Sequence, residues 1–444
     1  MNRTSPIHHI HNTAATLGLL LCALLLSCKG EDRSHEYEEL TAHNNWMLTV
    51  MQDKYLWGDQ LQEPTYKSYF YPGTQFFSTL TSSQKDTWSY CLVDSAITDP
   101  HTRGNFNHLD TYGIDFTVIN DPTKTTSRSF ARVTHVVEGS PAAQAGLRRN
   151  SFISIVDDTR ITSSNASKYL VNGKEHSIVF HHLDTLVTDS VEPTTYIWTD
   201  SIEATLPASR YVEEKAFPVA NILSVYGINI AYLMATRLVP YPDEQQTSGN
   251  TFLADLDAKM QAIMAFLPAE LILDLRLCNY GTIEMAQRLA SYIVPTALKD
   301  RTFLKTKWND RYAANNTTYT YDTTIGSLEL PHIYIITGTY TQGAAEWLIK
   351  ALQQTLGHEN VTIIGTATKG QNVMTQYIAS GYGHQLYPAV AYVTDESGDI
   401  SPTPITPTYT VNETANTYLL YMNEYGDPNE ILFAYCLAAM FAIE

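Results

Sequence analysis

At the turns expected after the strands between Glu270 and Asn372, few side chains could form a nucleophile–base pair. The hydroxyl groups of Thr339 and Thr341 precede the amine of Lys369 in this stretch, and a hydroxyl activated by a neutral amine is a possible nucleophile–base pair. Cys278 offers a thiol, but no histidine neighbours it and its flanks are apolar, which favours a packing role. None of these residues forms an evident pair of nucleophile and general base.

The histidines do not follow a metal-binding pattern. The sequence contains no HExxH string, and the adjacent pair His181 and His182 would face opposite sides of a strand. We therefore expect neither a metal nor a cofactor. The other histidines considered are His135, His332, His358 and His384.

Strands and helices alternate through the same stretch. The pieces 270–276, 333–339 and 361–372 each combine a short β-branched or apolar run with a turn, and helical patterns occupy 283–293 and 345–356. This alternation predicts an α/β fold with a mainly parallel sheet, whose sites lie at the carboxyl ends of the strands. The chemically poor stretch is thus expected at the active-site face of an enzyme fold.

The composition indicates an ordered, acidic, multidomain protein. A chain of 444 residues exceeds one hydrophobic core, so two or three domains are expected. The residues are 44% hydrophobic and 11% aromatic, which excludes general disorder. The formal net charge of −18 disfavours nucleic acid and anionic membrane as partners.

Residues 1–27 are expected to be a targeting segment. Arg3 precedes an apolar run from Leu17 to Leu26 that is too short to span a bilayer comfortably. A small residue before Cys28 ends this run, which resembles the bacterial lipobox and implies cleavage before Cys28 and lipidation of its sulfur. Residues 28–40 are predicted to form a flexible tether, so we expect a lipid-anchored protein of the bacterial cell envelope.

Residues 41–104 are expected to form a small helical subdomain. Trp46, Met51 and Tyr55 share one face of a helical pattern. Further aromatic residues follow through the segment. An aromatic core is the simplest interpretation.

Residues 105–185 change to an alternating β pattern with a distinctive turn string. In Gly139–Leu147, Ser140 can cap a short helix and Gly146 can end it. This string resembles a PDZ domain, a fold that adds an extended peptide to a sheet edge and holds its terminal carboxylate with backbone amides. The resemblance assigns peptide binding to Gly113, Ile114, Asp115 and Phe116.

With these pieces in order, the chain resembles the tail-specific, or C-terminal-processing, serine peptidase family. The opening pattern with Trp46, Met51 and 55–57, the PDZ-like string and the run Leu273–Arg276 carry the resemblance. The family order implies that residues 186–444 form the α/β catalytic domain. It also implies a serine nucleophile at a helix start and a lysine general base.

The family pattern places other residues at both catalytic positions. Thr341 and Glu346 align with the nucleophile motif, which puts Gly343 on the nucleophile, and the second motif puts Gln371 on the base. Glycine has no attacking group, and an amide accepts no proton near neutral pH. Lys369 lies two positions away, a displacement of about 6–7 Å along a strand, which exceeds the reach of a general base.

The loop after Arg276 also departs from the family pattern. Tyr280 stands where relatives have glycine, whereas Gly281 still permits a close backbone approach. Tyr280, Gly281 and Ala344 are the candidates for the oxyanion loops.

Three functions follow from these patterns. The first is a lipid-anchored pseudopeptidase that binds peptides or protein C-termini without turnover. The second is an active serine-type peptidase with a non-standard constellation, such as a displaced threonine and Lys369, or Cys278. The third is a structural envelope scaffold. The first interpretation rests on Gly343 and Gln371.

Overall fold

The computed structural model describes residues 34–93, 110–186, 195–199, 201–241, 251–398 and 402–441. These residues fall into two compact units, one made of 34–93 with 377–388 and one made of the remainder. The predicted targeting segment and Cys28 lie outside the described residues. The prediction of a flexible tether over residues 28–40 is wrong for 34–40, which form the start of the helix α2 (Ser34–Lys54). Among those described, no helix is both long and apolar enough to cross a membrane.

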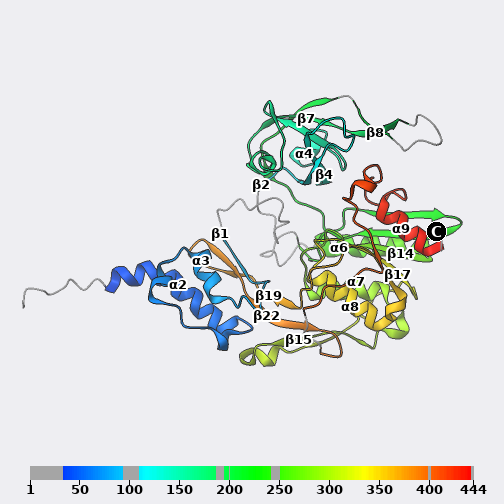
Figure 1. Ribbon diagram of the computed structural model, residues 1–444. Coiled ribbons are helices and arrows are strands. Elements are labelled where there is room, and N and C mark those ends of the chain that lie inside the picture. The colour runs from blue at the N-terminus through cyan, green and yellow to red at the C-terminus, as the bar shows by residue number, and fades with distance from the viewer. Residues whose placement is uncertain are drawn as a thin grey trace, which may run out of the picture. The chain divides into compact units, whose positions relative to one another are not determined.

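The first unit is a small helical body closed by a three-stranded sheet (Figure 1). Met47, Met51 and Tyr55 from the long helix α2 are buried, as are Phe76 and Phe77 from α3. The strands pair in the order β1–β21–β20, so a late segment of the chain completes the unit. Its elements are α2 (Ser34–Lys54), η1 (Gly58–Gln60), η2 (Tyr66–Phe70), α3 (Gly73–Leu80), β1 (Tyr90–Val93), β20 (Ile378–Ala379) and β21 (His384–Tyr387).

The second unit begins with a β-rich portion. Its main sheet has the order β10–β7–β5–β4–β3, with β6 paired to β5. The strands are β3 (Ile114–Asn120), β4 (Ser129–Val136), β5 (Phe152–Val156), β6 (Thr159–Arg160), β7 (His176–His181) and β10 (Ile202–Leu206). Two short pairs accompany it: β2 (Asp110–Thr111) with β11 (Arg210–Tyr211), and β8 (Leu183–Leu186) with β9 (Thr195–Trp198).

The predicted turn helix in this portion is confirmed. Ser140 caps α4 (Pro141–Gln144) by accepting a hydrogen bond from the Ala143 amide, and Pro141 occupies the first turn. Gly146 follows with φ +81°, a conformation that glycine adopts without strain. A second short helix, α5 (Ala166–Leu170), completes this portion.

The rest of the second unit is a three-layer α/β structure, which confirms the predicted fold class. The sheet order is β12–β13–β14–β17–β18–β23, antiparallel at β12 and parallel from β13 onward. Its strands are β12 (Ala220–Val225), β13 (Ile228–Met234), β14 (Glu270–Asp274), β17 (Ile333–Thr337), β18 (Val361–Gly365) and β23 (Tyr409–Thr410).

The sheet buries both faces because alternate residues point to opposite sides. Leu271 and Leu273 pack in the cluster formed with α6 (Thr251–Phe266), α7 (Ile283–Ile293) and α8 (Ala344–Leu356). Ile272, between them, packs in the cluster that contains α9 (Ile431–Phe441). These hydrophobic faces hold the carboxyl ends of β14 and β17 in a fixed arrangement.

A second, antiparallel sheet accompanies α8. Its order is β16–β15–β22–β19, with β15 (Thr302–Trp308), β16 (Thr318–Thr320), β19 (Val373–Thr375) and β22 (Ala389–Thr394). Short 3-10 helices lie at Thr296–Leu298 (η3), Asp310–Asn315 (η4), His358–Asn360 (η5) and Asn416–Tyr418 (η6). Since β19 follows Gln371 directly, this sheet helps to fix the loop that carries the predicted base position.

Candidate functional site

Gly343 occupies the sharp turn between β17 and α8. It is the N-cap of α8, with φ +59° and ψ −122°. Residues other than glycine rarely adopt this backbone conformation because it is strained. Enzymes use such strained strand-to-helix turns to expose a nucleophile. The turn therefore has the shape of a nucleophile elbow, with a residue that lacks a side chain.

Gln371 lies directly beside this elbow. A Cβ atom placed on Gly343 would be 3.1 Å from Oε1 of Gln371. The Gln371 side-chain amide donates a 2.9 Å hydrogen bond to the Val373 carbonyl. The fold thus brings together the two positions that the sequence aligned with nucleophile and base, at a spacing where a hydroxyl and an amine would meet.

The Glu346 carboxylate ties the elbow to the loop that carries Gln371. This fully buried group accepts hydrogen bonds from the Gly343 amide at 3.2 Å, the Gly370 amide at 2.5 Å and the Gln371 amide at 2.7 Å. It also accepts one from the Thr368 hydroxyl. Burial raises the pKa of Glu346, and these donors oppose the rise. Glu346 therefore positions both halves of the site.

We expect Glu346→Gln to lower the free energy of unfolding by about 2–4 kcal/mol. An amide presents an N–H₂ group where two backbone amides donate to Oε2, so at least one buried donor loses its acceptor. Urea unfolding followed by circular dichroism measures the change. The matched control is Glu284→Gln, an exposed carboxylate in the first turn of α7. Equal effects of both substitutions would contradict the role given to Glu346.

The candidate oxyanion loops also meet. A Cβ on Gly281 would lie 2.6 Å from Cβ of Ala344, so only glycine permits this approach. Leu238 donates to the Tyr280 carbonyl and accepts from the Thr282 amide, which turns the Gly281 N–H away from Leu238. The Tyr280 side chain packs against the hydrophobic cluster of α6, α7 and α8.

The other chemical groups of this stretch have structural surroundings. The buried Thr341 hydroxyl donates to the Leu275 carbonyl at 2.8 Å and accepts from the Gly338 amide at 2.9 Å. Lys369 is exposed, and Cys278 is fully buried. No group of three or more potential metal-ligating side chains occurs within the described ranges.

The PDZ-like peptide positions lie at one end of β3. This strand is terminal in the order of its sheet and pairs with β4. Gly113 has φ +74°, and a Cβ there would lie 2.3 Å from Cβ of Ser140. Ile114, Asp115 and Phe116 are buried. Their backbone thus forms an edge beside the capped turn of α4.

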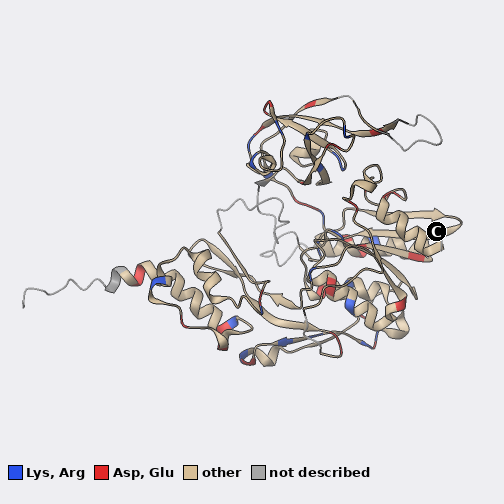
Figure 2. Cartoon of the chain, viewed as in Figure 1, with Lys and Arg blue, Asp and Glu red and all other residues tan. Residues whose placement is uncertain are grey.

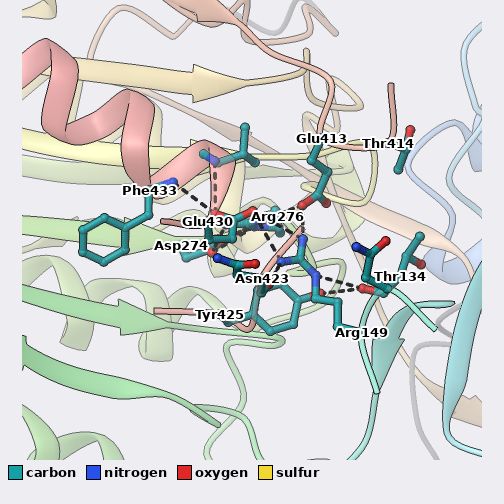
Figure 3. A network of polar contacts seen from close by, with 12 residues as sticks. Thr134, Arg149, Asp274, Arg276, Glu413, Thr414, Asn423, Tyr425, Glu430 and Phe433 are labelled. Atoms are coloured by element: carbon teal, nitrogen blue, oxygen red, sulfur yellow. Dashed lines mark hydrogen bonds and ion pairs between the residues drawn. The ribbon is translucent and has the colours of Figure 1, made fainter. Parts of the chain in front are cut away.

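A buried charge network adjoins the carboxyl end of β14 (Figure 3). Arg276 contacts Asp274 at 2.7 Å, Glu430 at 2.8 Å and Glu413 at 2.6 Å. Asp274 also accepts a 2.6 Å hydrogen bond from the Tyr232 hydroxyl. The side chains of Arg276, Asp274 and Glu430 are essentially inaccessible to solvent. The side chain of Glu413 is 19% exposed.

Arg149, from the β-rich portion, enters the same network. It forms ion pairs with Glu413 and, at 3.4 Å, with Glu430, and its guanidinium stacks 4.2 Å from the Tyr425 ring (Figure 3). Burial alone would lower the pKa of Arg149, but Glu413, Tyr425 and Glu430 raise it above its ordinary value. The charge of Arg149 therefore fastens the β-rich portion to the α/β portion.

Sequence reasoning did not identify this network beyond Asp274 and Arg276. The available signals were weak: Arg149 lies two residues after the PDZ-like string, and Glu430 is the last charged residue before the final apolar helix. Neither position indicates its partner, because the partners are more than 250 residues apart in the chain.

Comparisons with known proteins identify the family that this chain resembles. Residues 248–411 match the Peptidase family S41 model, and residues 42–90 match the Peptidase S41 N-terminal domain. A Bacteroides fragilis protein described as an S41 protease is 25% identical with a TM-score of 0.77, over 90% of this chain and 97% of that chain. A photosystem II D1 C-terminal processing protease is 15% identical with a TM-score of 0.46, over 88% of this chain and 99% of that chain.

A comparison with curated protein sequences finds no match. The fold and the elbow define a serine-peptidase architecture with a helical start and an α/β core. The two family models place residues 42–90 and 248–411 in peptidase family S41, the tail-specific or C-terminal-processing peptidases, as the sequence predicted.

Proposed function

We propose that this protein is a pseudopeptidase of the cell envelope, which binds peptides or protein C-termini without hydrolysing them. The observation that carries the proposal is the elbow itself. Gly343 keeps the strained geometry of a nucleophile position without a hydroxyl, and the adjacent group is the neutral carboxamide of Gln371.

The remaining hydroxyl and thiol groups favour this proposal over a non-standard peptidase. The Thr341 hydroxyl already donates and accepts hydrogen bonds in the core. Lys369 is exposed, and its backbone N–H donates a 3.1 Å hydrogen bond to the Thr341 carbonyl. Cys278 is buried among apolar residues. A buried thiol in such surroundings is ordinarily inert.

Two features support peptide binding. The strand β3 is the last in the order of its sheet, and PDZ domains take extended peptides as a strand added beside a terminal strand. The close approach of Gly281 to Ala344 keeps two loop segments together beside the elbow. Both features act through backbone groups, so the loss of a nucleophile does not remove them.

Attachment to the envelope membrane would follow from lipidation of Cys28. The apolar run before Cys28 and the small residue at Ser27 support this part of the proposal. The mass of the protein extracted from membranes measures the attached lipid. An unmodified thiol at Cys28 would contradict the anchor.

The binding proposal predicts a preference for free carboxylates. Peptides with a free C-terminus are expected to bind at least tenfold more tightly than their C-terminal amides, a difference of about 1.4 kcal/mol. Fluorescence anisotropy of a peptide library measures the affinities, and mass spectrometry shows whether the peptides stay intact. Cleavage by the unmodified protein, or failure to bind any peptide, would contradict the proposal.

A matched pair of glycine variants localises the binding. Gly113→Ala is expected to weaken binding at least tenfold, because its Cβ collides with Ser140. Gly139→Ala is the control, since Gly139 has a similar φ of +71° but nothing within 4 Å of the added Cβ. Equal affinities of the two variants would place the peptide elsewhere.

A further inference from the structure

An exposed apolar patch covers the start of α2 and the neighbouring 3-10 helix η2. Single exposed aromatic residues are ordinary, whereas a contiguous group marks an interaction site. This group, the anchor patch, is Tyr37 (47% exposed), Leu40 (67%), Tyr66 (74%), Phe70 (42%) and Tyr71 (37%).

Three aromatic rings of the anchor patch contact one another, and the segment that carries two of them is firmly held. The ring of Phe70 lies 6.2 Å from that of Tyr37 and 5.5 Å from that of Tyr66, in edge-to-face contacts. The buried Asn44 side chain donates 2.9 Å hydrogen bonds to the carbonyls of Tyr69 and Tyr71. These bonds fix η2 against α2, so the aromatic rings are presented on a rigid support.

The distance to Cys28 in the sequence identifies what this surface meets. Six residue steps separate Cys28 from Ser34, the first residue of α2. A fully extended chain covers at most about 3.5 Å per residue, so the start of α2, three residues before Tyr37, lies within about 21 Å of Cys28. This step rests on the proposed lipid anchor. A membrane surface is therefore the partner that the chain itself holds nearest to the patch.

We propose that the anchor patch lies in the headgroup layer of the membrane that holds the lipid on Cys28. Tyrosine rings suit this layer because they combine an apolar body with a polar hydroxyl. The exposed carboxylates Glu38 and Glu39 lie at the start of α2 (Figure 2), Glu63 precedes η2, and Lys67 in η2 is the exposed base of this region. This excess of negative charge favours zwitterionic over anionic headgroups. The patch would add a protein contact to the lipid attachment at Cys28 and set the orientation of α2 at the membrane surface.

Vesicle flotation tests the patch independently of the lipid. The chain from residue 28 with Cys28→Ser is mixed with vesicles of equal parts phosphatidylcholine and phosphatidylethanolamine. We expect it to float with the vesicles, and we expect Leu40→Ser, Tyr66→Ser and Phe70→Ser together to reduce the bound fraction at least tenfold. Replacing part of the phosphatidylcholine by the anionic phosphatidylglycerol should reduce vesicle binding by the parent chain.

The control is a double variant, Tyr226→Ser with Leu267→Ser, whose side chains are 77% and 81% exposed in the other unit. It should bind within twofold of the parent chain. The single variants Leu40→Ser and Tyr66→Ser, both at highly exposed positions, preserve the test if the triple variant does not fold. Absence of vesicle binding by the parent, or equal binding by patch and control variants, would overturn the proposal. A parent dimer that the patch variants convert to a monomer would overturn it in favour of contact between copies. Because lipidation is measured by mass, failure of the anchor is distinguished from failure of the patch.

Discussion

Replacing Arg276 by methionine is expected to lower the free energy of unfolding by about 3–5 kcal/mol. The guanidinium contacts Asp274, Glu413 and Glu430 at 2.6–2.8 Å in a site with almost no solvent access. Methionine can fill the volume, but it leaves these carboxylates without their main counter-charge. Urea unfolding of the second unit, followed by near-UV circular dichroism, measures the loss.

The same network predicts a dependence on pH. Burial opposes the charge of Glu430, but Arg276 and Arg149 outweigh it and lower the pKa of Glu430 to about 2. Because the folded-state pKa of Glu430 lies below the ordinary 4.5, its ionised carboxylate stabilises the fold above pH 4.5. This contribution to stability is lost as the pH falls toward about 2. The parent chain should therefore lose stability over this window more steeply than Arg276→Met.

Arg288→Met is the matched control for this experiment. Arg288 also contacts two carboxylates, Asp257 at 2.9 Å and Asp322 at 3.0 Å, but it is 27% exposed. Ion pairs that water reaches contribute about 0–1 kcal/mol. Equal losses in the two variants would show that burial does not set the strength of the Arg276 network.

Elements with a strong local pattern could be predicted from the sequence. The helix expected at 283–293 is α7 with the same bounds, and the helix expected at 345–356 is α8, which begins one residue earlier. The parallel pairing of β14, β17 and β18 followed from apolar runs separated by helices. The family resemblance added the alignment that singled out Gly343 and Gln371.

Long-range contacts could not be predicted in this way. Pairing of Tyr90 with Tyr387 joins segments almost 300 residues apart, and neither segment carries a local signal for its partner. The role of Glu346 could not be predicted either. Its carboxylate accepts hydrogen bonds from the backbone amides of Gly370 and Gln371, and these depend on the conformation of the loop. Likewise, the sequence patterns that revealed Arg276 as part of a strand end gave no indication of Glu430.

The second large effect is expected when peptide hydrolysis is restored at the turn that carries Gly343. Gly343→Ser combined with Gln371→Lys is expected to cleave a fluorogenic peptide about 100- to 1,000-fold faster than Gly343→Ala combined with Gln371→Lys. The reason is geometric: the backbone at Gly343 already has φ +59° and ψ −122°, and an added Cβ points to within 3.1 Å of the residue 371 side chain. A serine hydroxyl and a lysine amine would meet there without movement of the main chain.

The two single variants separate the contributions of nucleophile and base. Gly343→Ser alone should gain little, because Gln371 cannot accept the hydroxyl proton and the effects of nucleophile and base are not additive. It should also lose about 1–3 kcal/mol of stability, the cost of a side chain in this backbone conformation. A fluorophosphonate probe that labels residue 343 in the double variant alone would locate the new activity. If the folded double variant neither reacts with the probe nor exceeds the alanine control, the adjoining loops at Gly281 and Ala344 no longer stabilise an oxyanion. In that case the chain has lost more of the peptidase mechanism than two side chains, although the proposed peptide-binding edge at β3 would be unaffected.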